Sequence, residues 1–359
     1  MILTFPHMGN MYIAAKAFLD DIGIKTVVPP PVTKRTLELG TKYSPELICL
    51  PFKINLGNYI ESIEMGANTI LITGSCGPCR FGLYGMVQEE ILRDMGYDVD
   101  VLIFDPPRES PAKLFESLSK LRTGKGTRVV LRSISKIGAL VKGCDNLYEL
   151  AIYKRAREQI KGETDSILNE FEKDVRTVFG IDETLHLFKK YKSKFEQIAE
   201  VEGCAPLNVG LVGEIYTLIE PYVNLNIEKR LGQLGVHVDR SMTVSGWVNT
   251  HLLPNLLARS KERQMLREAK PYLDMCIGGH AWQTVGHSMD YIKNSYDGII
   301  QIMPFGCMPE IVVQSILPSI SKEEGIPIMT LTVDELTGTS GYGTRLEAFV
   351  ETIAQRRVQ

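Results

Sequence analysis

The chain has 359 residues, more than one domain usually contains, so two domains are the first expectation. A hydrophobic share of 44%, a charged share of 23% and a net charge of -3 are ordinary for a globular protein and give no reason to expect nucleic acid or a membrane surface as partner. No apolar run reaches the length of a bilayer span, and the N-terminus lacks the features of a signal peptide, so we expect a cytoplasmic protein.

The first hundred residues alternate between short apolar runs and helical patterns. Strands are expected at residues 2–5, 25–28, 47–50, 69–73 and 99–104. Helical patterns separate them at residues 11–21, 33–39, 56–65 and 83–95, the second ending at Gly40. Strands separated by such helices predict βαβ units and a parallel sheet. Residues 1–109 are therefore expected to form a doubly wound α/β lobe.

The segment 74–82, Gly-Ser-Cys-Gly-Pro-Cys-Arg-Phe-Gly, lies between an expected strand and an expected helix. Pro78 favours the first helical position, so Cys76 and Cys79 are expected beside a helix N-terminus. The unpaired N–H groups and partial positive charge there lower the pKa of a thiol and favour the thiolate. Gly77 lets the backbone come close to a bound group. A Cys-x-x-Cys pair alone fits a redox-active pair, half of a zinc site or part of an iron–sulfur site.

The middle of the chain, residues 110–205, has a different composition. Helical stretches dominate, and residues 151–200 carry Lys and Arg in equal number to Asp and Glu. Balanced charge on amphipathic helices is typical of a solvated face rather than of a basic binding patch. This stretch is expected to be a helical connector or subdomain.

The alternation returns in residues 206–359. A strand running into a loop is expected at 209–216, with further extended segments at 236–238, 242–244, 298–303 and 326–333. Helices are expected at 224–234, 247–269 and 344–356. The whole chain is thus expected to be an α/β protein with two Rossmann-like doubly wound lobes, a helical middle segment and a ligand site between the lobes.

An odd number of cysteines without an export signal argues against a disulfide framework. The seven are Cys49, Cys76, Cys79, Cys144, Cys204, Cys276 and Cys307. Cys49 and Cys307 each lie within two residues of a Pro-Phe that ends an expected strand. Because open α/β sheets bind ligands at the carboxyl ends of their strands, we expect both thiols and the 76–79 turn in one cleft. Cys144 and Cys204 are expected to be buried small hydrophobes.

Three or more thiolates in a dry cleft suit a soft-ligand metal centre. Structural zinc normally shows two close pairs of ligands, and this chain has one close pair. An iron–sulfur cluster accommodates cysteines that are far apart in sequence. From the residues alone, an iron–sulfur cluster, a zinc site or redox thiol pair, and buried structural cysteines all stay open.

Several blocks of the sequence resemble one family. They are Cys49-Leu50-Pro51-Phe52-Lys53 with Leu56-Gly57-Asn58, Gly77-Pro78-Cys79-Arg80, the segment 210–216, Gly278-Gly279-His280, Pro304-Phe305-Gly306-Cys307-Met308-Pro309-Glu310, Asp334-Glu335, and Thr344-Arg345-Leu346-Glu347-Ala348-Phe349. Together they resemble the 2-hydroxyacyl-CoA dehydratase component D family, in the branch of the CoA-substrate-specific enzyme activase-related and double-cubane cluster proteins. The resemblance covers nearly the whole chain except its charged middle.

The resemblance implies two Rossmann-like lobes with a [4Fe-4S] cluster or a double cubane held between them through cysteines. It implies Cys49, Cys79 and Cys307 as the first ligands, and Cys76 and Cys276 as further thiols for a second cubane or in place of a neighbour. A double cubane would need one more ligand, Cys204 or Cys144, so the choice between one and two clusters stays open.

The implied function is low-potential reductive chemistry of anaerobic metabolism on an acyl-CoA or another small substrate. The chain lacks the phosphate-binding signature that the ATP-driven activators of this system carry near their N-terminus, and it has no Gly-x-x-x-x-Gly-Lys-Ser/Thr loop. We therefore expect a cluster-bearing component that receives electrons from a separate ATP-dependent activator. Two other readings stay open: a non-catalytic electron-transfer or cluster-carrying protein and, less favoured, a zinc- or thiol-based binding protein.

Four polar residues are further candidates. Glu214, His280 and Glu310 are candidate catalytic groups, although helix capping explains Glu310 nearly as well and a structural role explains His280 better. Arg80 can pair with a thiolate, a cluster or a substrate phosphate, and Gly77 lies in the same turn. A homodimer is expected from the general frequency of such assemblies.

Overall fold

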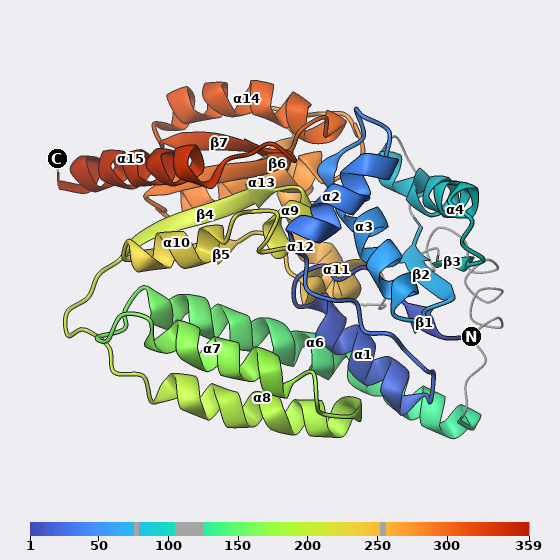
Figure 1. The fold of residues 1–359 in the computed structure, drawn as a ribbon. Helices are drawn as coiled ribbons and strands as arrows, with labels where there is room; N and C mark the ends of the chain where they lie inside the picture. Colours follow the sequence, from blue (N-terminus) through green and yellow to red (C-terminus); the bar gives the residue numbers. More distant parts are fainter. Residues whose placement is uncertain (75–78, 105–124, 252–255, 359) are drawn as a thin grey trace. The chain divides into compact units, whose positions relative to one another are not determined.

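The computed structural model describes residues 1–74, 79–104, 125–251 and 256–358 (Figure 1). The chain divides into two compact units, which are described separately. Unit 1 comprises Met1–Cys144, Val178–Leu185 and Val244–Asn255, and unit 2 comprises Asp145–Thr177, His186–Thr243 and Leu256–Gln359. The stretch 110–205, expected to be a segment of its own, contributes residues to both units.

Unit 1 is built on a parallel sheet. Its strands are β1 (Leu3–Thr4), β2 (Thr69–Thr73) and β3 (Asp100–Phe104), in the order β1-β2-β3. On the other side of β1, Thr26 forms a single parallel bridge to Leu3, so the strand expected at 25–28 is reduced to one bridge. Since the chain goes first to one side of β1 and then to the other, its connections reverse direction between β1 and β2.

The helices of unit 1 include α1 (Met11–Asp21), α2 (Lys34–Tyr43), α3 (Leu50–Glu64), a 3-10 turn η1 (Arg80–Leu83), α4 (Tyr84–Asp94) and α11 (Val244–His251). A capping box starts α2, because the side chain of Thr33 accepts from the Thr36 N–H and the Thr36 hydroxyl accepts from the Thr33 N–H. Helix α3 is buried along most of its length and packs with α4 and β2 around Phe52, Leu56 and Tyr59.

Gly40 was expected to end the second helix, and this prediction is wrong. It lies inside α2, where a Cβ atom would be 1.7 Å from the carbonyl oxygen of Lys53 in α3. The reciprocal position is Gly57, where a Cβ atom would be 1.9 Å from the carbonyl oxygen of Thr36. These two glycines let the backbones of α2 and α3 touch, so they serve packing rather than termination.

The strand expected at 47–50 is also wrong. Leu47 and Ile48 belong to a turn, Cys49 is the N-cap of α3, and the helix begins at Leu50. Pro51 lies in the first helical turn, where its fixed φ favours helix initiation and its missing N–H costs nothing. The proline taken to end a strand therefore starts a helix.

Three long helices occupy the described part of the stretch 110–205. They are α6 (Thr127–Arg155), α7 (Glu163–Asp174) and α8 (Gly180–Glu196), which agrees with the helical character expected there. Many of their charges form exposed ion pairs, such as Lys194 with Glu170 at 2.6 Å. The Arg155–Asp165 pair in unit 2 is different, since both side chains are largely buried and lie 2.8 Å apart.

Unit 2 contains a second parallel sheet. Its strands are β4 (Leu207–Gly213), β5 (Val236–Arg240), β6 (Gly298–Pro304) and β7 (Ile328–Val333), in the order β5-β4-β6-β7. The chain moves from β4 to β5 on one side, then returns to place β6 and β7 on the other side. The connections therefore leave β4 and β6 in opposite directions, which makes the crevice between these strands the topological switch point of the sheet.

Helices cover both faces of this sheet (Figure 1). A Cβ atom at Gly210 would lie 2.2 Å from the ring of Tyr291 in α13 (Ala281–Lys293), and one at Gly298 would lie 2.9 Å from the ring of Phe349 in α15 (Thr339–Val358). Gly210 pairs with Ile299, the neighbour of Gly298, so the two glycines face opposite sides. The remaining helices are α9 (Ile215–Ile219), α10 (Ile227–Gln233), α12 (Leu256–Ala269) and α14 (Met308–Glu324).

The prediction of an α/β fold with parallel sheets is confirmed. The extended segment expected at 242–244 is wrong, because α11 starts at Val244. The long helix expected at 247–269 is covered by α11 and α12, and residues 252–255 between them lie outside the described residues. Across the described ranges, we find no helix with the length and apolar character needed to span a membrane.

Candidate functional site

The thiol of Cys49 in unit 1 contacts a tyrosine hydroxyl. Cys49 is the N-cap of α3 and has an extended backbone, with φ -65 and ψ 147. Its Sγ lies 2.6 Å from the Oη of Tyr84 at the start of α4. Both residues are buried in the core of unit 1, so the thiol and the hydroxyl are largely shielded from water.

Two aromatic rings hold Tyr84 in place. Phe52 in α3 meets it edge to face at a centroid distance of 5.0 Å, and Phe81 in η1 meets it at 5.1 Å. Because Phe81 belongs to the segment after Cys79, the same aromatic cluster joins the Cys49 helix start to the Cys79 turn.

The Cys79 turn is tied to the Cys49 loop by a second contact. Cys79 is the N-cap of η1, again with extended backbone, and is partly exposed. The next residue, Arg80, donates from Nη1 to the carbonyl oxygen of Leu47 at 3.0 Å. The structure thus brings together two of the predicted cysteine segments in unit 1. Cys76, Gly77 and Pro78 lie outside the described residues.

Cys307 in unit 2 repeats the construction found at Cys49. It is the N-cap of α14, with φ -75 and ψ 100, and Pro309 lies in the first turn, as Pro51 does after Cys49. Gly306 turns the chain with φ 74, and the Cys307 N–H donates to the carbonyl oxygen of Pro304, the last residue of β6. Cys307 therefore lies at the carboxyl end of β6, as predicted.

The start of α13 lies against the start of α14. Gly278 and Gly279 both have positive φ, and a Cβ atom at Gly279 would be 2.8 Å from the Cγ of Pro309. His280, the N-cap of α13, follows these glycines directly. The structure thereby brings the predicted residues His280 and Cys307 to adjoining helix starts. Cys276 is exposed in the segment before them.

Glu214 follows β4 and caps α9. Its Oε1 accepts from the Tyr216 N–H and its Oε2 from the Thr217 N–H, both at 3.0 Å. Burial raises the pKa of Glu214, while the two N–H donors act in the opposite direction. The predicted polar group at the end of β4 is present, with capping as its observed role.

Glu310 is the most deeply buried acid of the candidate set, with 1% of its surface exposed. Its Oε1 accepts from the Thr284 hydroxyl at 2.9 Å and its Oε2 from the Gln301 side-chain amide at 2.8 Å. Burial raises the pKa of Glu310 from 4.5 to about 7, the two hydrogen bonds oppose this, and the Glu214 carboxylate adds to it. The expected capping role is therefore incomplete, because the side chain engages the sheet and α13.

Sequence reasoning did not identify Thr284 and Gln301. Gln301 has a visible signal, since it is the one polar side chain in the otherwise apolar strand β6, Gly-Ile-Ile-Gln-Ile-Met-Pro. A polar group in a fully buried strand requires a hydrogen-bonding partner. Thr284 is an ordinary threonine within a helix and has no comparable signal.

The two cysteines assigned to packing differ from each other. Cys144 is buried, as predicted, with its Sγ 3.7 Å from the carbonyl oxygen of Asn10. Cys204 is exposed, so its predicted burial is wrong. It lies in the loop before β4 rather than in a helix or strand that faces a core.

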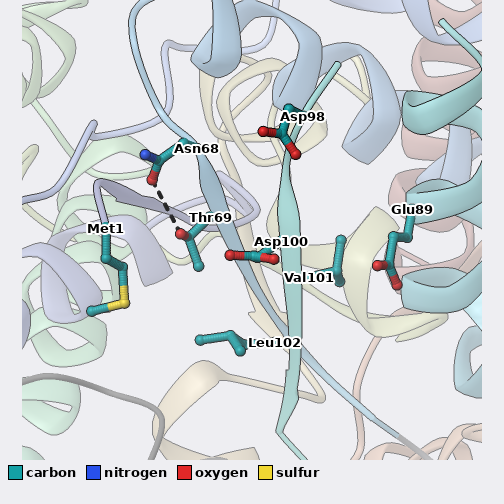
Figure 2. A pocket seen from close by; sticks show the side chains of 8 residues that line it. All are labelled: Met1, Asn68, Thr69, Glu89, Asp98, Asp100, Val101 and Leu102. Carbon is teal, nitrogen blue, oxygen red and sulfur yellow. Dashed lines mark hydrogen bonds between the residues drawn. The ribbon is translucent and has the colours of Figure 1, made fainter. Parts of the chain in front are cut away.

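A hollow in unit 1 is lined by carboxylates but lies at the edge of the sheet where the strands begin. Figure 2 shows Glu89, Asp98 and Asp100 around it, together with Met1, Asn68, Thr69, Val101 and Leu102. Thr69 and Asp100 are the first residues of β2 and β3. Ligands of open α/β sheets bind at the carboxyl ends, so this hollow is not the candidate site.

Within the described residues, no three or more His, Cys, Asp or Glu side chains are grouped closely enough to hold a metal ion. Three of the described cysteines, Cys49, Cys79 and Cys307, are N-caps of helices or of a 3-10 turn. No family model matches the chain, and no curated protein matches it.

Proposed function

We propose that the chain is an iron–sulfur protein of the 2-hydroxyacyl-CoA dehydratase component D type. Cys49, Cys79 and Cys307 are its first ligands, with Cys76 and Cys276 as further thiols. Its reaction is a low-potential reduction of an acyl-CoA or another small substrate. When bound, the cluster would supply one-electron transfer.

The observation that carries this proposal is the repeated Cys-x-Pro helix start. Cys49 begins a helix of 15 residues and Cys307 one of 17, and in each case proline occupies the first turn. The free N–H groups and the dipole of a helix stabilise negative charge at its N-terminus. Both thiols are thus placed where the thiolate, the ligand form, is favoured.

Tyr84 and Arg80 provide a hydroxyl group and a positive charge in the part of unit 1 that carries Cys49 and Cys79. The Tyr84 hydroxyl is within hydrogen-bond distance of the Cys49 sulfur, and Arg80, the residue after Cys79, donates from its guanidinium to the Leu47 carbonyl oxygen. Hydrogen bonds to sulfur and nearby charge tune the potential of an iron–sulfur centre. These contacts favour a redox role over a purely structural zinc site.

Glu214, His280 and Glu310 are the polar groups proposed to serve the reaction in unit 2. All three lie at or next to the starts of helices that follow β4 or flank β6. Ligands of an open parallel sheet bind at a topological switch point, and the carboxyl ends of β4 and β6 form one here. A small-molecule substrate is proposed to bind there.

The second candidate function is a non-catalytic electron-transfer or cluster-carrying protein. It is favoured by the burial of Cys49, since an enclosed thiol suits ligation without substrate access. A zinc or thiol protein is the weaker third candidate. The proposed partners are an ATP-dependent activator as electron donor and a second copy of the chain.

The deciding experiment is purification under argon, followed by iron and sulfide analysis and a visible spectrum. The proposal expects stoichiometric iron and sulfide, and Cys49→Ser, Cys79→Ser and Cys307→Ser are each expected to lose or remodel the centre while the circular dichroism spectrum is kept. Cys144→Ala is the control and should keep its iron, because Cys144 is a packed side chain, buried with its sulfur 3.7 Å from the Asn10 carbonyl oxygen. Zinc without sulfide, or full iron retention in all three variants, would contradict the proposal.

A further inference from the structure

A buried hydrogen-bond network surrounds the carboxyl group of Glu310 in unit 2. The amide oxygen of Gln301 accepts from the Thr330 hydroxyl at 2.9 Å, which fixes the amide so that its Nε2 is turned toward Glu310. That Nε2 lies 2.8 Å from the Glu310 Oε2 and 3.2 Å from the Glu310 carbonyl oxygen. At the other carboxyl oxygen, the Thr284 hydroxyl donates to Oε1 at 2.9 Å.

All the direct partners of this carboxyl are neutral. A hydroxyl and an amide stabilise a carboxylate less than a cation does, and among the described residues no Lys or Arg acts on Glu310. The one charged group that acts on it is Glu214, which is also an acid. Two acids in a site without a cation favour one ionised and one protonated carboxyl.

The network assigns the proton to one of the two acids. Each carboxyl oxygen of Glu214 accepts a hydrogen bond from a backbone N–H group. Both bonds are made best by the ionised carboxylate, so Glu214 is the acid that stays ionised. Glu310 faces a threonine hydroxyl that can either donate or accept. When Oε1 is protonated, the hydroxyl of Thr284 can turn its hydrogen to the carbonyl one helical turn earlier. The network thus remains satisfied in both protonation states.

We propose that Glu310 is a proton-exchanging residue and that Thr284 and Gln301 are its positioning residues. One proton binds at Oε1, beside Thr284, and is released to solvent when the carboxyl ionises. This places an exchangeable proton at the switch point of the unit 2 sheet, available to a reaction that consumes one. The inference rests on the role in the reaction proposed above for Glu310 and deepens it, but it does not need a bound cluster.

Other titratable groups on the surrounding elements must be separated from Glu310. His280 and His287 lie on α13 before and after Thr284, Asp334 follows β7, Glu214 follows β4, and Cys307 begins α14 itself. Of these, Glu214 alone acts on the Glu310 carboxyl. A readout that is specific for protonated carboxyl groups is therefore required.

Infrared difference spectroscopy across a pH titration of the purified full chain meets this requirement. We expect a carboxylic acid C=O band that disappears with a midpoint near neutral pH and is missing in Glu310→Gln. Thr284→Val removes the hydroxyl at constant shape and should raise the proton affinity about tenfold, since hydrogen bonds to charged groups are stronger than those to neutral ones. Thr284→Ser should restore the original midpoint.

Ser288→Ala is the matched control, because Ser288 is a buried hydroxyl on the same helix that bonds the Thr284 carbonyl and not Glu310. If Thr284→Val does not fold, Gln301→Met tests the same expectation from the other oxygen. A band that persists in Glu310→Gln, or a midpoint that stays fixed in both Thr284→Val and Gln301→Met, would overturn the inference. Iron content, measured on the same samples, reports separately on the proposed function.

Discussion

The hydroxyl oxygen of Tyr84 lies 2.6 Å from the sulfur of Cys49, although 35 positions separate the two residues. A phenol hydroxyl that donates to sulfur stabilises negative charge on that sulfur. The contact is buried between α3 and α4, so it is stronger than a solvent-exposed one. It links Cys49, the N-cap of α3, to the first residue of α4.

Tyr84→Phe is the first test of this contact. The variant keeps the ring contacts with Phe52 and Phe81 and removes only the hydrogen bond. On the proposed function, iron content should be unchanged, and the midpoint potential should fall by about 40 mV if the bond contributes about 1 kcal/mol. Protein film voltammetry or a dye-mediated titration under argon measures it. Tyr59→Phe is the control, since Tyr59 is a buried tyrosine of the same core whose hydroxyl has no hydrogen-bond partner among the described residues. Equal midpoint potentials in the wild type and both variants would show that the Tyr84 hydroxyl does not act on the centre.

Arg80→Gln tests the charge beside Cys79. On the proposed function, loss of a positive charge that favours the reduced state should make the centre harder to reduce while iron is retained. Arg80 also bonds the Leu47 carbonyl, so Arg80→Lys serves as the matched variant that keeps the charge but loses the planar guanidinium. A potential that falls in Arg80→Gln and stays near the wild-type value in Arg80→Lys assigns the effect to charge. An equal fall in both variants would assign it to the contact with Leu47 instead.

Glu310→Gln tests the buried acid through stability. The pKa of Glu310 is raised from 4.5 to about 7 in the native state, so between these values the native state binds more protons than the unfolded chain. Stability therefore falls as the pH rises through this range, by about 3 kcal/mol in total. The neutral variant lacks this loss, so its advantage in the free energy of unfolding should grow from about pH 4.5 and level off above about pH 7. Urea unfolding at several pH values measures it, and a difference independent of pH would contradict the assignment.

Gly57→Ala tests the contact of α2 with α3. The added Cβ atom would lie 1.9 Å from the Thr36 carbonyl oxygen, a backbone atom that cannot rotate away. The helices must separate, and a cost of about 3 kcal/mol or more is expected. Gly126→Ala is the control, because a Cβ atom there has no neighbour within 4 Å. Thermal and urea unfolding of both variants compare them directly, and equal stabilities would show that the contact is not constrained.

The predictions from sequence succeeded where an apolar run is bounded by residues that end a strand. Strands β2 and β6 are short apolar runs with clear ends, and both were predicted to within about one residue. Cys307 was correctly placed because β6 ends at Pro304, three residues before it. In such segments the local preference and the tertiary structure coincide.

The failures come from residues with two physical uses. Proline can end a strand or start a helix, and Pro51 lies in the first turn of α3. Cys49 is therefore the N-cap of a helix and not part of the strand predicted there. Glycine ends a helix or lets two helices touch, and Gly40 does the latter. The network around Glu310 depends on which side chains meet across α13, β6 and β7, and periodicity does not contain that information.

The direction of the strands in unit 2 has a practical consequence for labelling the protein. All four strands are parallel, so the thiol and the acids follow one edge, whereas the turns that lead into the strands lie at the opposite edge. Gly325, exposed and left-handed at the end of α14, is such a turn, and so is Gly235 before β5. A short peptide tag or a fluorophore attachment site inserted at Gly325 should therefore report on the folding of unit 2 without disturbing Glu214, Cys307 and Glu310 near the opposite edge.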